Sequence, residues 1–120
     1  MKKLSILLLG TLLFGEYFYS NGKQIDLKLN SVSRSGIKYY SLNNGIILGV
    51  NNYILVKFNK DVNVSKYENN YNIKKIKTIK NRFYLFKTPL NKSLEISNTL
   101  YNLDDVIFAH PDFIHKIERR

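Results

Sequence analysis

Residues 53–58 read YILVKF, a run in which apolar side chains recur at every second position, at Ile54, Val56 and Phe58. Successive side chains of a strand point to opposite faces, so this period predicts a β-strand with one continuous apolar face. The other face of the same strand carries Tyr53, Leu55 and Lys57.

A helix and two further strands are predicted directly after this strand. Asp61 or Asn63 can cap a short helix through VSKYENNY (64–71), whose apolar residues recur at helical spacing. IKKIKTIK (73–80) has isoleucines three apart, which a helix would also explain. Its β-branched content and the abrupt partner run NRFYLFK (81–87) favour a pair of strands.

A second helix and a last strand complete the series. NKSLEISNTLYNL (91–103) predicts a helix capped by Asn91, with Ile96, Leu100 and Leu103 on its inner face, and VIFAH (106–110) predicts a strand. The order is β-α-β-β-α-β over residues 52–111. It predicts an α+β fold, a ferredoxin-like antiparallel sandwich with both helices on one face of the sheet.

Two helices cover only one side of such a sheet. The opposite side is predicted to carry an exposed surface of Tyr53, Leu55, Tyr84 and Phe86. The alternative is that the preceding segment folds over it. That segment, residues 37–51, holds two apolar runs around Asn43, Asn44 and Gly45, which predict a β-hairpin.

The first 36 residues predict a leader and a linker. Two lysines at positions 2 and 3 precede an apolar run from Leu4 to Phe14, the form of a secretory signal peptide (1–22), with processing near Gly22. A buried N-terminal helix is the alternative. The run is too short for a transmembrane helix, which needs about 20 residues. Residues 23–36 predict a linker with at most one short strand, and the protein is expected to be secreted or periplasmic, without stable membrane insertion.

Composition limits the classes of partner. The chain has 120 residues, no cysteine and a formal net charge of +10. This length fits one domain, and the absence of thiols excludes a disulfide framework. The positive charge suits nucleic acid, an anionic membrane or an acidic protein, although a codon bias toward Lys, Asn and Ile would produce it without any function.

No catalytic pattern is present in the sequence. His110 and His115 lie five residues apart, a spacing that matches neither one strand face nor one helical turn. The nucleophile-elbow, P-loop, dinucleotide and zinc-protease motifs are absent. We therefore expect no enzymatic activity, no cofactor and no metal site.

Three runs resemble the N-terminal propeptide of bacterial subtilisin-like serine proteases. These are ILVKF (54–58), LEISNTLY (94–101), and the closing pattern of Val106, Ala109, Pro111, Asp112 and Phe113. The resemblance covers residues 52–115, and the hairpin at 37–51 resembles the extension that precedes this domain in larger members.

The resemblance implies a folding chaperone and inhibitor of a protease domain. In such propeptides the sheet face packs on the catalytic domain, and the segment after the last strand lies in the substrate cleft; here that segment is a tail at 112–120. The protease-binding residues implied are Tyr53, Leu55, Tyr84, Phe86, Phe108, Ala109, His110, Pro111, Asp112, Phe113, Arg119 and Arg120.

The chain carries none of the catalytic triad motifs that follow such a propeptide. It is therefore expected to act on a separate protease, or to be the remnant of a truncated precursor. Two rival functions remain. One is an exported α+β binding domain of unknown role. The other is an RNA-recognition-like module, against which NRFYLFK lacks the glycine expected on its third strand.

Overall fold

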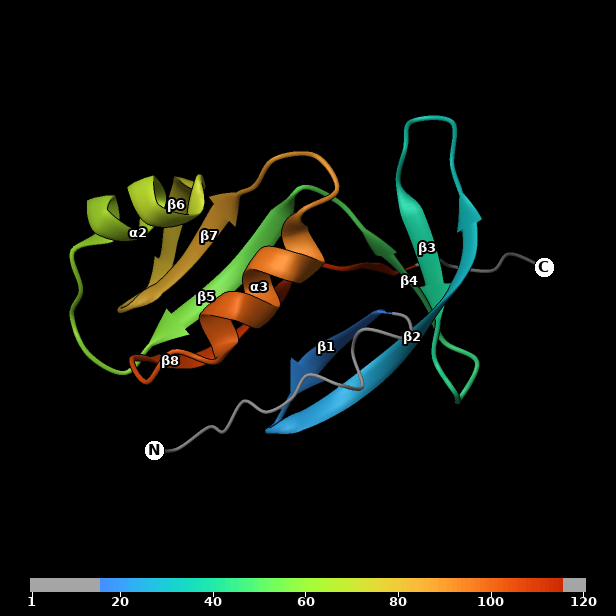
Figure 1. Cartoon of the computed structure of the whole chain (residues 1–120), viewed down its shortest axis with the longest axis horizontal. Helices are drawn as coiled ribbons and strands as arrows, with labels where there is room; N and C mark the ends of the chain where they lie inside the picture. Colours follow the sequence, from blue (N-terminus) through green and yellow to red (C-terminus); the bar gives the residue numbers. More distant parts are fainter. Residues whose placement is uncertain (1–15, 116–120) are drawn as a thin grey trace.

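The computed structural model describes residues 16–115, which form nine strands and two helices. The strands make two antiparallel sheets, one of four strands and one of five (Figure 1). No helix among the described residues is long and apolar enough to cross a membrane.

The four-stranded sheet has the order β6-β7-β5-β8, and two helices interrupt its chain path. The elements follow one another as predicted, although Lys92, and not Asn91, takes the cap position of the second helix. Their bounds are β5 (Tyr53–Phe58), α2 (Val64–Tyr71), β6 (Lys74–Lys80), β7 (Phe83–Lys87), α3 (Ser93–Tyr101) and β8 (Val106–Pro111).

The five-stranded sheet has the order β1-β2-β3-β4-β9. Asn21 and Gly22, both at positive φ (50° and 80°), form the two-residue turn between its first strands. The predicted hairpin around Gly45 (φ 90°) is confirmed as its third and fourth strands. The bounds are β1 (Glu16–Ser20), β2 (Lys23–Val32), β3 (Lys38–Ser41), β4 (Ile47–Val50) and β9 (Ile114–His115).

The predicted fold class, a ferredoxin-like α+β sandwich preceded by a hairpin, is wrong. The protein is mostly β, with two antiparallel sheets curled into a half-barrel. The polar stretch 23–36, predicted as a linker, contains the ten-residue strand β2. The stretch does alternate, with Ile25, Leu27 and Leu29 at every second position, although only Leu27 of these three is fully buried.

The predicted signal peptide falls mainly on residues 1–15, outside the described residues. Its last part contains β1, where Phe18 is buried. Cleavage near Gly22 would therefore remove a strand of the folded domain, whereas a leader that ends before Glu16 is compatible with this structure.

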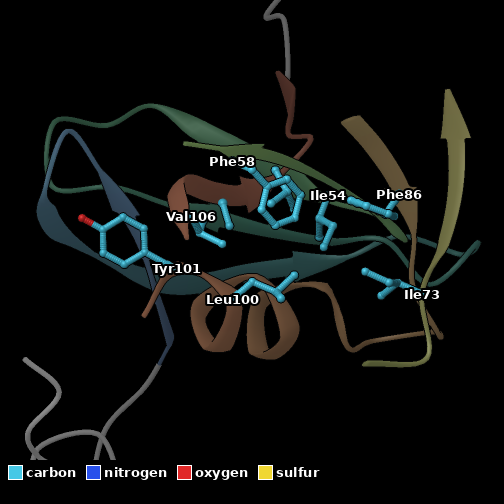
Figure 2. Close-up of a cluster of buried hydrophobic side chains, with 9 residues drawn as sticks. Ile54, Phe58, Ile73, Phe86, Leu100, Tyr101 and Val106 are labelled. Carbon is cyan, nitrogen blue, oxygen red and sulfur yellow. The ribbon is translucent and has the colours of Figure 1, made fainter. Parts of the chain in front are cut away.

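Two buried clusters hold the molecule together. In the larger one, Ile54, Phe58 and Val106 of the sheet point toward Leu100 and Tyr101 of α3 (Figure 2). The smaller cluster lies on the five-stranded sheet and contains Phe18, Leu27, Tyr40, Leu48 and Leu94. Because Leu94 belongs to α3, the same helix packs against both sheets.

A short segment after β8 connects the two sheets. The amide of Asp112 donates to the carbonyl oxygen of Tyr53 (2.9 Å), which extends the pairing of β5 and β8 beyond Pro111. The ring of Phe113 packs edge-on against Phe18, with 4.7 Å between centroids, and β9 then pairs with β4. We call residues 112–115 the connecting segment.

Candidate functional site

The strand registers determine which side chains share a face of the four-stranded sheet. Ile54 pairs with Phe86 and with Pro111, and Val56 pairs with Tyr84 and with Ala109. Partners in an antiparallel ladder lie on the same side. Ile54, Val56 and Phe86 are fully buried under the helices, so this side of the sheet is the core face.

The opposite side is a second, regular array, which we call the outer face. Its side chains form three rows that run across the strands. The central row passes through Leu55, which pairs with Leu85 and His110, and the other two rows pass through Tyr53 and Lys57. Its members are Lys74, Lys77 and Lys80 of β6, Phe83, Leu85 and Lys87 of β7, Tyr53, Leu55 and Lys57 of β5, and Phe108 and His110 of β8.

No helix lies over the outer face within residues 16–115. Both α2 and α3 pack on the core face, through Tyr67 and Tyr71 and through Leu100 and Tyr101. No side chain of the outer face belongs to either buried cluster. The hairpin of β3 and β4, which could have covered this side, lies in the five-stranded sheet instead.

Aromatic rings line one end of the outer face. Phe83 and Phe108 meet edge to face, with 5.3 Å between centroids and 79° between planes. His110 stacks on Phe108 at 5.4 Å, and its other neighbour is Phe113 at 6.2 Å. The Nδ1 atom of His110 donates to the carbonyl oxygen of Pro111 (2.9 Å), which fixes the ring. These rings are half-buried.

The remaining charge on the outer face is positive. Four of its lysines, Lys74, Lys77, Lys80 and Lys87, are exposed, and Lys57 is half-buried. The ion pairs found among the described residues join Lys60, Arg82 and Lys92 to carboxylates, so none involves a lysine of the outer face. Of the nearby carboxylates, Asp61 pairs with Arg82 (3.1 Å), and Glu68 accepts a hydrogen bond from the backbone amide of Lys75 (2.7 Å).

The structure brings together some of the predicted site residues and separates others. Tyr53, Leu55, Phe108 and His110 lie on the outer face. Ala109 and Pro111 are buried on the core face. Arg119 and Arg120 lie outside the described residues.

The prediction that Tyr84 and Phe86 are exposed on the uncovered side is wrong. Phe86 is fully buried, and Tyr84 packs beside Phe58 in the larger core cluster. The run FYLF has no polar residue to mark its solvent side, and a shift of one residue exchanges the two faces of a strand. The turn at Asn81 and Arg82 sets the register and directs Phe83 and Leu85 outward.

Phe113, predicted to enter a protease cleft, packs instead against the smaller cluster beside Phe18. Asp112 bonds through its amide to Tyr53 and so belongs to the connecting segment. The predicted tail at 112–120 is therefore part of the fold as far as His115, because Ile114 and His115 form β9.

Sequence reasoning missed the lysines of β6 as site residues. Lys74, Lys77 and Lys80 are three apart, a spacing that does not place residues on one face of a regular strand. The register shifts at Ile76 and Ile79 bring all three to the outer face. The signal was present as the KxxKxxK pattern, but its meaning depends on two bulges.

Other features of the described residues have structural roles. The phenol of Tyr40 is buried and lies against the Glu16 carboxylate, and desolvation followed by this contact raises its pKa far above the ordinary value. A cavity of about 270 Å³ lies between β3 and the start of α3 and includes Lys38, Tyr40 and Leu90 in its lining. No group of three or more potential metal ligands occurs among residues 16–115.

No protein-family model matches this sequence, and no curated protein or solved structure is similar enough to count as a relative.

Proposed function

We propose that this chain is a propeptide-like inhibitor and folding chaperone of a subtilisin-like serine protease, acting in trans or as the remnant of a truncated protease precursor. The observation that carries the proposal is the outer face, where apolar side chains including Leu55, Leu85 and Phe108 lie opposite the helices without a cover of their own. Apolar surface of this kind on a small domain is typical of an interface.

The size of the outer face implies a second contact. Four strands about 4.8 Å apart, with three rows of side chains about 7 Å apart, give a projected area of roughly 300 Å². A stable complex buries about 800 Å² on each partner. The surface beyond the sheet must therefore contribute, and the resemblance of the sequence to propeptides assigns that role to the chain after the connecting segment.

The connecting segment gives this second contact a defined origin. Phe113 is fixed against Phe18, and Ile114 and His115 pair with β4, so the chain reaches residue 115 in an extended conformation. We propose that residues 116–120, including Arg119 and Arg120, are the part that enters the substrate cleft, by strand addition. Asp112 and Phe113 are assigned to the fold of the inhibitor and not to the cleft.

Nucleic acid is the rival partner, because the outer face combines lysines with aromatic rings. Bases stack on open ring faces. Here Phe83 meets Phe108 edge to face, and His110 covers a face of Phe108. This arrangement favours a flat apolar contact with protein over a stacking platform for bases.

Inhibition assays on a panel of subtilisin-like proteases test the proposal. We expect the full-length chain to inhibit at least one protease of the panel. Its melting temperature should rise when a protease with an active-site Ser→Ala substitution is added, because a partner that binds only the folded form stabilises it. Leu85→Ala should weaken inhibition by about 1–3 kcal/mol, as for interface anchors.

Leu29→Ala is the matched control, since it makes the same substitution at a leucine that is 53% exposed and lies on the five-stranded sheet. It should leave inhibition unchanged. Failure of the domain to inhibit or to bind any member of the panel would refute the proposed function, and binding to a single-stranded oligonucleotide in its place would support the rival.

A further inference from the structure

We propose that the outer face recognises an acidic protein surface, oriented so that its carboxylates meet the lysines of β6 while its apolar centre meets Leu55 and Leu85. The inference deepens the proposed function and rests on it for the protease as partner. Positive charge is spread over the outer face, and none of the ion pairs among the described residues involves one of its lysines.

Charge is asymmetric across the outer face. Lys74, Lys77 and Lys80 form one edge, which we call the lysine column, and Lys87 and Lys57 follow on the next two strands. The opposite edge on β8 has Phe108 and His110 in place of lysines. The face therefore has a basic side and an aromatic side, which gives a docking partner one preferred orientation.

Protection of a free sheet edge explains only part of this pattern. Lysines and bulges on an edge strand such as β6 discourage pairing with other chains, and the shifts at Ile76 and Ile79 have that effect. Lys57 and Lys87, however, lie on interior strands of the sheet, where no edge needs protection. Positive charge across three adjacent strands points to the face itself as its site of action.

Two other occupants fit the face less well. A second copy would bring the lysines of both faces into one interface with no carboxylate of the array to pair them, and like charges at close range oppose association. An anionic membrane would need side chains that project into it, yet Phe83 and Phe108 pack against each other at 5.3 Å and are half-buried. An acidic protein surface with an apolar centre matches both the charge and the flatness of the array.

The contributions of the lysine column and of the apolar centre to binding should be separable by experiment. Charge at the rim of an interface acts mainly on the association rate and is screened by salt, with a Debye length of about 10 Å at 0.1 M. Apolar anchors act mainly on dissociation. The lysine column should therefore control the salt dependence of binding, and Leu85 should control the residual affinity at high salt.

The first arm measures binding of inactive Ser→Ala subtilisin-like proteases, chosen with acidic and with basic isoelectric points, at low and moderate salt. The column variant carries glutamate at the three positions of the lysine column. The control variant has the same change in net charge at exposed lysines away from the outer face, namely Lys23, Lys28 and Lys66.

We expect the wild-type domain to prefer the acidic proteases, and the column variant to bind them about 10-fold to 100-fold more weakly at low salt, mainly through a slower association rate. The control variant should lose about threefold or less, through its net charge alone. If the column and control variants bind alike, or if affinity does not follow the acidity of the protease, the inference is overturned while the proposed function stands.

The second arm does not depend on a protease. A helical peptide with leucine along one side and glutamate on both borders is titrated into isotopically labelled protein, in parallel with a (dT)20 oligonucleotide and with phosphatidylglycerol vesicles. NMR shift changes at Leu55, Leu85 and the lysine column with the peptide support the inference. Changes at the outer face only with the oligonucleotide or the vesicles, or no changes there with any probe, overturn it.

Discussion

Two adjacent residues of β7 should respond to truncation in opposite ways. Phe86 is fully buried against Ile54 in the larger core cluster, whereas Leu85 lies on the outer face between Leu55 and Lys77. Replacing a buried phenylalanine by alanine costs about 3–5 kcal/mol, from lost transfer free energy and from the cavity left behind. Phe86→Ala should fall in this range, and Leu85→Ala should cost about 1 kcal/mol or less.

The difference is large on the scale of this domain. The free energy of unfolding of a small domain is about 5–15 kcal/mol, and a loss of 1 kcal/mol lowers the melting temperature of a 60–100-residue domain by about 4–8 °C. Phe86→Ala should therefore lower the melting temperature by roughly 15 °C or more, or leave the protein unfolded. Leu85→Ala should melt within a few degrees of wild type but bind a partner less tightly.

Urea denaturation followed by circular dichroism, together with binding of each variant that still folds, measures both effects. Tyr84→Phe is a suitable control because it keeps the ring that packs beside Phe58 and removes only the hydroxyl. If Leu85→Ala unfolded the protein and Phe86→Ala did not, the register of β7 would be shifted by one residue, and the outer face would be composed of other side chains.

The connecting segment, the close contact of Gly49 with Tyr39 between β3 and β4, and a buried phenol give three further tests. Phe113→Ala should lower stability by about 2–4 kcal/mol in urea denaturation, because the ring joins the smaller cluster, whereas deletion of residues 116–120 should leave stability unchanged and abolish most inhibition. Gly49→Ala should lower stability by about 1–3 kcal/mol in the same assay, since the new Cβ would lie 2.8 Å from the ring of Tyr39. Burial raises the pKa of Tyr40 in the folded state, so the contribution of this phenol to stability is complete below about pH 10, the unfolded pKa, and is lost as the pH rises further. Melting curves from pH 8 to 11 should show this loss of stability. The loss should be smaller in the Tyr40→Phe variant.

The order of the elements of residues 53–111 could be predicted from the sequence because each has a local signal, although the faces of β6 and β7 could not. In β5, the residues with the apolar period are the buried ones, and the helix at 64–71 has the predicted bounds. These signals are local, since each depends on spacing within one element. The interpretation of 53–58 as a strand with two unlike faces is confirmed by the burial of alternate residues.

The fold as a whole could not be predicted in this way. β2 has a short apolar alternation at Ile25, Leu27 and Leu29, which could have been read as a strand, but its place in the sheet is set by pairing with β1 and β3. β9 is two residues long and exists only because β4 offers a partner. Strands that depend on pairing more than on burial leave little trace in a single sequence.

The two sheets are coupled, and this coupling limits where the tail can act. Leu94 of α3 belongs to the smaller cluster, Leu100 of the same helix belongs to the larger one, and Phe113 joins the end of β8 to β1. Residues beyond 115 are therefore joined to the fold through β9 and Phe113, and not directly through β8. If the tail binds in a cleft while the outer face holds the partner, both contacts are fixed to one rigid body. The affinity of the two together should then exceed that of either alone through effective concentration, without any new contact.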